Sequence, residues 1–518
     1  MPTSVDLSGK PFHFIGIGGI GMSALAYILA KRNLPIYGSD VKSSHITRRL
    51  EDLGAHIFWH QDASNFAIFQ GKNLSDHSST SELLTVGGVA SHNGKGQGTP
   101  ELPQVICSTA IQRGNSEYQA AVDLGCPIFH RSDLLAALIT DYQSIAVAGT
   151  HGKTTTSSLI AYLLLEAGLD PTIVVGGEVN AWKGNARLGQ GPYLVAEADE
   201  SDGSLVKLKA SIGVVTNVEL DHPDHYQNLD QVISTFEVFE QNCQTLIGCW
   251  DCATVKEHLH PSITYSLQPD AGADYTVDQV EYHGEHTTAR VWERGVSLGT
   301  VRLSLLGAHN LSNALAAIAV GRFLGLEFAV ISGALGSFEG ARRRFEHRGE
   351  HNGILFVDDY AHHPSEIQAT LAAARLRVQS VPSDSQTPLT KSCRRIIAIF
   401  QPHRYSRTQA FLAEFAQSFQ GADMVVISEI YSAGESNLGM ITGQQVADLI
   451  ANYQPHVYFQ PSLEAMKQFL VETLRPGDLA LFLGAGNLNQ IIPDVMDYYQ
   501  QAEAQGVSVS ERHSASLS

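Results

Sequence analysis

A glycine-rich loop that ends in a lysine carries the clearest chemical signal in this sequence. The run Gly149-Thr150-His151-Gly152-Lys153-Thr154-Thr155 lies between a short apolar segment, residues 145–148, and a helical pattern. In such a loop the backbone N–H groups point at a phosphate, Lys153 adds a positive charge, and the Thr154 hydroxyl can bind Mg²⁺. The full P-loop pattern has an early glycine where this chain has Val147. We interpret the loop as an ATP site rather than as a lysine that merely follows a glycine turn.

A second glycine loop lies near the N-terminus. Gly16, Gly18 and Gly21 match G-x-G-x-x-G after the apolar residues 12–15, and Asp40 stands where an acid could bind a ribose hydroxyl. The pattern alone fits a site for NAD, FAD or another nucleotide diphosphate. It also fits a tight strand-to-helix turn that binds no ligand. Because an ATP-type loop follows later in the chain, we disfavour a dehydrogenase and expect no NAD.

Acidic residues and a histidine follow two further apolar runs. Glu197 ends the run at residues 194–196 within a cluster that includes Glu200, and His222 comes soon after residues 212–216. Carboxyl ends of parallel strands meet at the ligand-binding edge of a sheet. Glu197, His222 and Thr154 could therefore hold Mg²⁺, or Mn²⁺, together with ATP oxygens. The acidic cluster taken alone is more typical of a solvated loop, but the ATP-type loop at Lys153 in the same domain favours metal binding.

Two motifs near the C-terminal third contain histidines and arginines. Asp358-Asp359-Tyr360-Ala361-His362-His363-Pro364 follows an apolar run, and its paired histidines could bind a metal, although no further ligand pattern supports one. Arg404 and Arg407 follow residues 396–400 and could clamp a carboxylate with forked donors, or form surface ion pairs.

The cysteines do not indicate a metal centre. Cys249 and Cys252 have the spacing of half a zinc or redox site, with His258 and His260 downstream, but no second C-x-x-C pair exists. Six cysteines in 518 residues, without a charged and then apolar leader, favour a reducing cytoplasm.

Composition limits the possible partners. The chain has 43% hydrophobic and 17% charged residues, as in an ordinary globular protein, and its net charge is −19. That charge repels nucleic acid and anionic lipid, so any phosphate must be held locally. No apolar run is long enough to span a bilayer, and we expect no membrane insertion.

Alternating short apolar runs and helical patterns predict an α/β protein with parallel sheets. The length suggests about three domains. We place them at residues 1–140, 141–344 and 345–518, the first two with a nucleotide-type βαβ unit and the third with strands separated by helices. Polar insertions at residues 71–103 and 381–391, and a polar tail after residue 504, are expected to lie outside the packed cores.

Together these motifs resemble the Mur ligases of peptidoglycan synthesis, over roughly residues 11–495. The resemblance implies a Rossmann-like first domain, a central P-loop ATPase-type domain and a Rossmann-like third domain. It rests on residues 13–19 with Gly21-Met22-Ser23, Gly38-Ser39-Asp40, residues 148–155, residues 197–202, Thr216-Asn217 with Asp221-His222, Ala308-His309-Asn310, Arg343-Arg344-Phe345, residues 358–364 and residues 401–408.

The resemblance also implies ligands for these motifs. The first glycine loop would hold the UDP diphosphate of a sugar nucleotide, the second the ATP phosphates, and Thr154, Glu197 and His222 would handle magnesium. A carbamylated lysine found in sibling enzymes is not expected, because its neighbourhood reads Ile233-Ser234-Thr235-Phe236. The implied contacts are Gly16, Gly18, Gly19, Gly21, Asp40, Ser108 and Thr109 for the UDP-sugar, Asn310, Arg344 and Asp359 for ATP beside its loop, and Tyr360, His362, Arg404 and Arg407 for L-alanine.

Residues 360–364 and 403–408 favour the branch that joins L-alanine to the lactyl carboxylate of UDP-N-acetylmuramate through an acyl phosphate. Lys153, His222, His362 and Arg404 would be the catalytic residues. Two alternatives stay open: a recycling ligase that adds a preformed murein peptide to the same sugar nucleotide, and a nucleotide-gated binding protein. We expect a cytoplasmic monomer or weak homodimer.

Overall fold

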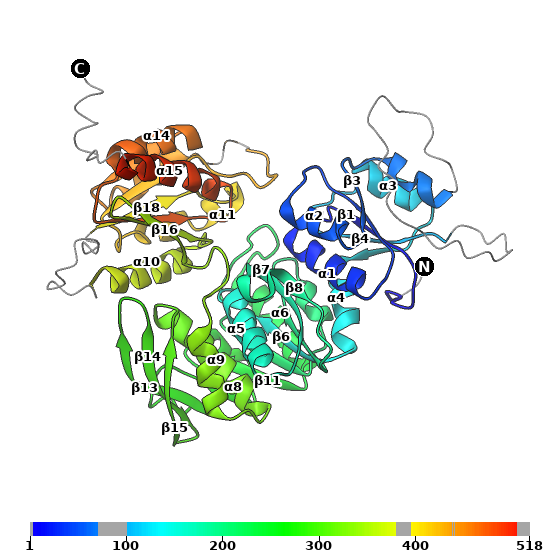
Figure 1. Ribbon diagram of the computed structural model, residues 1–518, viewed down its shortest axis with the longest axis horizontal. Helices are drawn as coiled ribbons and strands as arrows, with labels where there is room; N and C mark the ends of the chain where they lie inside the picture. The colour runs from blue at the N-terminus through cyan, green and yellow to red at the C-terminus, as the bar shows by residue number, and fades with distance from the viewer. Residues whose placement is uncertain (1–3, 71–100, 380–394, 438, 440, 505–518) are drawn as a thin grey trace.

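The computed structural model describes residues 4–70, 101–379, 395–437, 439 and 441–504. In these residues the chain forms three α/β units in sequence order, which lie as three lobes in Figure 1. This confirms the predicted α/β class with a parallel-sheet core in each part. The insertion expected at residues 71–103 falls mostly outside the described residues, as do residues 381–391 and the tail from residue 505.

The N-terminal unit is a parallel sheet in the order β3-β2-β1-β4-β5. The first glycine loop follows β1, so it lies at the carboxyl edge between β2 and β4. The elements are β1 (Phe12–Ile15), α1 (Ile20–Lys31), β2 (Ile36–Ser39), α2 (His45–Glu51), β3 (His56–Phe58), the 3₁₀ helix η1 (Ala63–Gln70), β4 (Gln104–Cys107), α3 (Ser116–Asp123), β5 (Ile128–His130) and α4 (Arg131–Thr140).

The central unit contains one large mixed sheet in the order β15-β14-β13-β12-β11-β10-β6-β9-β7-β8. Its elements are β6 (Gln143–Ala148), α5 (Lys153–Glu166), β7 (Thr172–Val179), η2 (Asn180–Trp182), β8 (Gly184–Arg187), β9 (Tyr193–Glu197), η3 (Ser204–Lys207), β10 (Ile212–Val215), α6 (Leu229–Asn242), β11 (Thr245–Cys249), α7 (Ala253–His258), β12 (Ile263–Tyr265), β13 (Tyr275–Tyr282), β14 (Thr287–Glu293), β15 (Val296–Leu303), α8 (Ala308–Phe323) and α9 (Phe328–Ser337).

The parallel middle of this sheet positions the ATP-type loop. β6 pairs with both β9 and β10, so the loop after β6, Glu197 at the end of β9 and the segment after β10 share one edge. Helices α5 and α8 pack against the same face, in one apolar core that includes Val147, Leu163 and Leu315. The antiparallel strands β13–β15 extend the sheet at its far end, and sequence analysis did not predict them.

The C-terminal unit has the strand order β16-β17-β21-β18-β19-β20, with only β16 antiparallel to its neighbour. Its elements are β16 (Glu346–His351), β17 (Ile354–Asp359), α10 (Pro364–Gln379), β18 (Arg395–Phe400), α11 (Tyr405–Ala410), α12 (Leu412–Gln417), β19 (Met424–Ser428), α13 (Gly443–Ile450), β20 (Val457–Gln460), α14 (Leu463–Thr473), β21 (Asp478–Leu483), η4 (Leu488–Ile491) and α15 (Ile492–Ala504).

The N-terminal and central units share a core, whereas the C-terminal unit has its own. Leu138 of α4 belongs to the same buried cluster as Ala146 of β6 and Phe236 of α6. The C-terminal sheet is covered by separate clusters on its two faces. The domain boundaries at residues 140 and 344 stay a prediction. Across the described residues no helix is long and apolar enough to cross a membrane.

A buried polar network lies beneath the first glycine loop. The Glu117 carboxylate is 2.7 Å from His13 Nε2 and accepts hydrogen bonds from Asn65 Nδ2 (2.7 Å) and Ser39 Oγ (2.5 Å). All four side chains are fully buried. Because Ser39 ends β2 and directly precedes Asp40, the network fixes the strand that carries the predicted ribose-binding acid.

Replacement of Glu117 by alanine tests this network. The change leaves three buried polar groups without their acceptor, so we expect the free energy of local unfolding to fall by about 3 kcal/mol. Native-state hydrogen exchange of β1 and β4 measures the loss within this unit. Glu51→Ala, at an exposed position on α2, is the matched control and should change the same quantity by less than about 0.5 kcal/mol. Equal exchange in the two variants would contradict the assignment.

Candidate active site

The loop after β6 is shaped for close approach to an anion. Gly149 and Gly152 have φ of 139° and 81°, values that residues other than glycine rarely adopt. A Cβ on Gly152 would lie 2.6 Å from Oδ1 of Asn313, and one on Gly149 would overlap the Thr216 hydroxyl. Helix α5 begins at Lys153, so its free N–H groups lie at the loop. The role of this loop as a phosphate cradle stays a prediction.

Lys153 contacts its own loop and a neighbouring carboxylate. Its Nζ donates to the carbonyls of Gly149 (2.7 Å) and Thr150 (3.1 Å) and lies 2.8 Å from the Glu200 carboxylate. Burial opposes the charge of Lys153, but Glu200 and Asp199 outweigh it and raise the pKa of the ammonium above its ordinary value. Lys153 is therefore a charged lysine, largely but not fully buried, among carboxylates.

His151 and Thr150 tie the loop to other segments. The two nitrogens of His151 lie 3.3 Å from Glu219 Oε2 and 3.3 Å from Glu366 Oε1. Burial disfavours a charged ring, yet these two carboxylates raise the pKa of His151 to about 10. Thr150 Oγ1 donates to the Glu219 carbonyl (3.2 Å), and Thr155 is buried in the first turn of α5. Since Glu366 lies on α10, His151 links the loop to the C-terminal unit.

Two of the predicted magnesium ligands lie together. The Thr154 hydroxyl donates to Glu197 Oε1 (3.1 Å), and Glu197 Oε2 accepts the Gly176 N–H (2.7 Å). Arg344 donates to the same hydroxyl (3.2 Å), which brings the start of the C-terminal unit to the loop. A hydroxyl beside a carboxylate is a donor set that fits Mg²⁺.

The third predicted ligand, His222, lies near the carboxylate that holds Lys153. Its Nε2 is 3.8 Å from Glu200 Oε1, the carboxylate that also holds the lysine. Burial, partly offset by Asp221, lowers the pKa of His222. Arg407 forms a two-pronged ion pair with Asp221, Nε to Oδ1 at 2.8 Å and Nη2 to Oδ2 at 3.2 Å.

The predicted alanine ligands gather near this ion pair but already have protein partners. Arg404 Nη1 donates to Asp224 Oδ2 (2.8 Å), a residue of the central unit. The guanidinium carbon of Arg344 lies over the ring of Tyr360, 5.1 Å from the centroid of that ring. Burial lowers the pKa of His362 to about 3, so its ring is neutral near pH 7. The forked arginines thus clamp carboxylates of this chain in the present structure.

The predicted adenine and ribose residues are also engaged. Asn310, on α8, donates to the Leu306 carbonyl (2.8 Å). Asp359, at the end of β17, accepts the N–H groups of Phe345 (2.7 Å) and Ala361 (2.8 Å). Burial raises the pKa of Asp359 to about 6. Their roles toward ATP stay predictions.

The sugar-nucleotide residues meet at the edge of the N-terminal sheet. The Asp40 carboxylate accepts the Gly18 N–H (2.8 Å) and thereby fixes the first glycine loop, while Ser108 and Thr109 follow β4 beside it. The loop glycines are Gly16, Gly18, Gly19 and Gly21, and a Cβ on Gly18 would lie 2.8 Å from Asp40 Oδ2. The acid and the glycine loop therefore lie together through a contact within the protein, and their roles toward a sugar nucleotide stay predictions.

Several residues other than glycine have a positive φ where the central and C-terminal units meet. The Phe345 N–H is held by Asp359, and the Arg404 N–H donates to the Tyr431 carbonyl (2.8 Å). Such conformations cost free energy and persist only where the surroundings fix them. The residues with positive φ around the site are His222, Arg343, Phe345 and Arg404.

Several carboxylates that organise the site were not among the predicted site residues. Glu219, Glu366 and Asp221 pair with His151 or Arg407 across segments far apart in the chain. Arg131, at the start of α4, donates to Asp199 (2.7 Å) and joins the N-terminal unit to the acidic cluster. Glu366 had a signal, because an acid in the first turn of a helix after His-His-Pro is well placed to accept backbone N–H groups.

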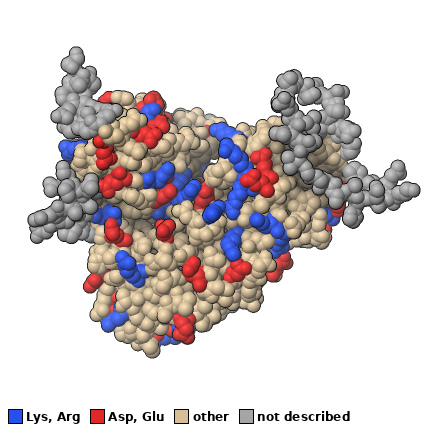
Figure 2. All heavy atoms as spheres, in the orientation of Figure 1, with Lys and Arg blue, Asp and Glu red and all other residues tan. Residues whose placement is uncertain are grey.

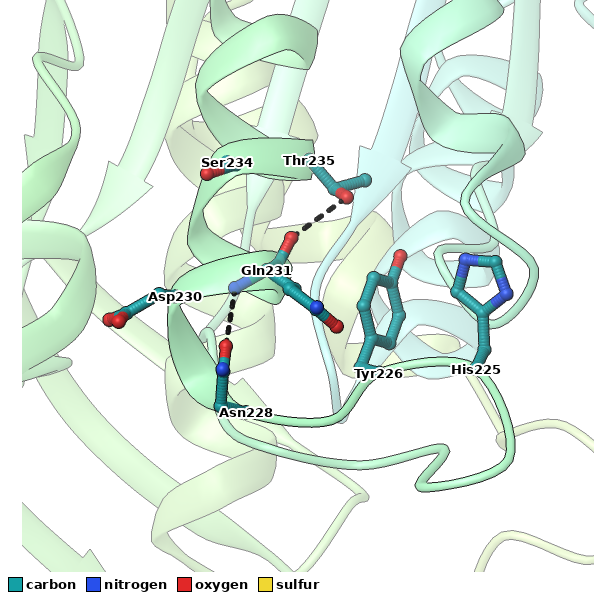
Figure 3. A pocket seen from close by; sticks show the side chains of 7 residues that line it. All are labelled: His225, Tyr226, Asn228, Asp230, Gln231, Ser234 and Thr235. Atoms are coloured by element: carbon teal, nitrogen blue, oxygen red, sulfur yellow. Dashed lines mark hydrogen bonds between the residues drawn. The ribbon is translucent and has the colours of Figure 1, made fainter.

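An open polar pocket of about 470 Å³ lies at the start of α6 (Figure 3). The Tyr226 hydroxyl donates to the Glu200 carbonyl (2.6 Å) and connects the pocket to the site. Ser234 and Thr235, from the segment where siblings are expected to carry the modified lysine, line its other wall. Figure 2 shows Lys and Arg side chains gathered over the junction of the lobes, despite the net charge of −19.

A phosphate loop at the edge of a parallel sheet, completed by residues of two flanking α/β units, defines a three-domain nucleotide-binding enzyme. The chain belongs to the Mur ligase family: residues 11–143 match the Mur ligase family catalytic domain, residues 147–321 the Mur ligase middle domain, and residues 343–486 the Mur ligase glutamate ligase domain.

The chain is also similar to individual proteins of this family. The chain is 64% identical to the UDP-N-acetylmuramate–L-alanine ligase of Trichodesmium erythraeum, over 98% of this chain and 99% of that protein. It is similar to the crystal structure of the UDP-N-acetylmuramate–alanine ligase MurC of Thermotoga maritima, with 27% identity, a TM-score of 0.75 and coverage of 95% and 100%. A murein peptide ligase of Psychrobacter arcticus has the same fold, with 23% identity, a TM-score of 0.66 and coverage of 95% and 99%.

The two arginine pairs give a contrast that can be measured. The side chains of Arg407 and Asp221 are 3% and 6% exposed, so Arg407→Ala leaves a buried carboxylate unpaired and should cost about 3–5 kcal/mol. The side chains of Arg404 and Asp224 are 33% and 37% exposed, so Arg404→Ala should cost less than about 1 kcal/mol. Hydrogen exchange of α11 in the full chain measures both. Equal losses would show that the buried pair does not hold the two units together.

Proposed function

We propose that this chain is an ATP-dependent ligase that joins L-alanine to the lactyl carboxylate of UDP-N-acetylmuramate and releases ADP and phosphate. Relatives that are 60–64% identical over nearly the whole chain carry the name of this activity, and the Mur ligase family is ATP-dependent. The observation that carries the proposal is the junction at the ATP loop. There Thr154 and His151 of the central unit contact Arg344 and Glu366, which flank the predicted alanine residues.

The reaction needs activation, because a carboxylate does not form an amide until one of its oxygens becomes a leaving group. The lactyl carboxylate attacks the γ-phosphorus of ATP, the bond to the ADP oxygen breaks, and an acyl phosphate forms. The amine of L-alanine then attacks the acyl carbon, loses a proton and expels phosphate. Lys153 neutralises the charge that develops on the transferred phosphoryl group.

Thr154 and Glu197 are the residues that would hold Mg²⁺, with His222 as a further ligand. When bound, Mg²⁺ or Mn²⁺ neutralises phosphate charge. Arg344 already donates to Thr154, so it is placed to contact the same phosphates. The first glycine loop with Asp40, Ser108 and Thr109 would bind the UDP diphosphate.

Arg404, Arg407, Tyr360 and His362 would surround the alanine. The positive groups orient its carboxylate so that the amine faces the acyl carbon. Arg404 has the more exposed ion pair of the two, so it can exchange Asp224 for a substrate carboxylate at the smaller cost. His362 is the candidate acceptor for the proton released by the amine.

Closure of the units would exclude water from the acyl phosphate. We propose a cytoplasmic monomer or weak homodimer, in line with the few cysteines of the chain. The recycling ligase is the second candidate, and the resemblance to a murein peptide ligase supports it only at the level of the fold.

Lys153→Ala tests the role of the loop. Loss of the charge on the phosphoryl group should lower the turnover number about a thousandfold or more while the protein stays folded. Phosphate release in the presence of all three substrates measures turnover, and circular dichroism checks folding. Lys256→Ala, on α7, is the control and should retain activity. Wild-type turnover in Lys153→Ala would refute the role of the lysine.

The amino acceptor distinguishes the two ligase candidates. With ATP and UDP-N-acetylmuramate, we expect phosphate release to increase at least tenfold on addition of L-alanine, but not on addition of L-Ala-D-Glu-diaminopimelate. Mass spectrometry should find the amide product in the first reaction only. The reverse preference would identify the recycling activity, and nucleotide binding without any new amide would identify a nucleotide-gated binding protein.

A further inference from the structure

The proposed ligase reaction assigns no role to His363, the second histidine of the His-His-Pro motif. His363 is 5% exposed, and its Nε2 is buried without a hydrogen-bond partner among the described residues. Its other nitrogen, Nδ1, accepts the Ser365 N–H (3.3 Å). Burial lowers the pKa of His363 to about 4, which leaves the ring neutral. An unpartnered, buried and neutral imidazole nitrogen is an available metal ligand.

Two further side chains that can bind a metal ion, from other segments of the chain, lie near His363. A ring nitrogen of His363, a nitrogen of His151 and a carboxylate oxygen of Glu219 all lie within 4.8 Å of one another. The rings of His151 and His363 have centroids 4.7 Å apart. Small side-chain movements would bring the three atoms to the ligand distances of a single ion, about 2.0–2.2 Å.

The groups around the three residues have the arrangement that supports metal ligands. His151 Nε2 lies 3.3 Å from the Glu219 carboxylate, and Nδ1 of the same ring lies 3.3 Å from the Glu366 carboxylate. The Ser365 hydroxyl donates to Glu219 Oε2 (2.9 Å). Carboxylates that orient a ligating histidine, and hydrogen bonds to a ligating carboxylate, are the usual outer contacts of a zinc site.

We propose that His151, Glu219 and His363 form a site for a Zn²⁺-type transition-metal ion, which links the ATP loop to the C-terminal unit. Two imidazoles and one carboxylate, with a fourth position for water, favour Zn²⁺ over Mg²⁺. The ion takes the place of the proton that His151 shares with Glu219. The sequence showed only the paired histidines, because the other ligands come from the segments after β6 and β10.

Zn²⁺ titration of the full, nucleotide-free chain by calorimetry tests the site directly and does not depend on ligase activity. We expect wild type to bind one more ion per chain than His363→Gln, or to bind that ion at least tenfold more tightly. Glu219→Gln, at a partly exposed position, should give the same loss and guards against misfolding of the buried variant. His260→Gln, with a side chain that is 87% exposed, should match wild type.

Co²⁺ absorption supplies a second readout, because a four-coordinate Co²⁺ site gives a stronger visible band than hydrated Co²⁺. The band should be present in wild type and His260→Gln and absent in His363→Gln and Glu219→Gln. Equal Zn²⁺ stoichiometry and affinity in all four proteins would overturn the proposal, as would a Co²⁺ band that persists in both ligand variants.

Discussion

The charge on Lys153 constrains the rest of the active site. A largely buried ammonium requires nearby negative charge, and Glu200 and Asp199 supply it. A bound phosphate must compete with Glu200 for the same ammonium. Burial raises the pKa of Glu200 to about 7, so this carboxylate is the partner that gives up its charge most readily. The loop therefore carries a positive charge that a phosphate could bind, and the carboxylates keep that charge paired.

The same principle extends to the contact between the central and C-terminal units. Arg407 with Asp221, Arg344 with Thr154, and His151 with Glu366 each join a residue predicted to bind substrate to a partner in the other unit. The C-terminal unit has a separate apolar core, so polar contacts rather than a shared core connect it to the ATP loop. Polar pairs can exchange partners for a ligand, whereas a continuous apolar core could not.

Local sequence patterns predicted the strands and loops that carry the site. Strand β1 coincides with the expected residues 12–15, and Lys153 begins the expected helix after the glycine loop. These features depend on neighbouring residues, such as apolar runs and glycine turns. The strands β13–β15 were missed because alternation in an antiparallel extension differs from the buried runs of parallel strands.

The partners of the site residues were harder to predict than the residues themselves. Asp221 and Arg407 are 186 positions apart, and each side chain alone fits a ligand role or a surface ion pair. Only the fold shows that both are buried against each other. For the same reason His363 had no apparent further ligands in the sequence, although His151 and Glu219 lie beside it in space. Because contacts of this kind join different sheets, residue spacing along one segment carries no information about them.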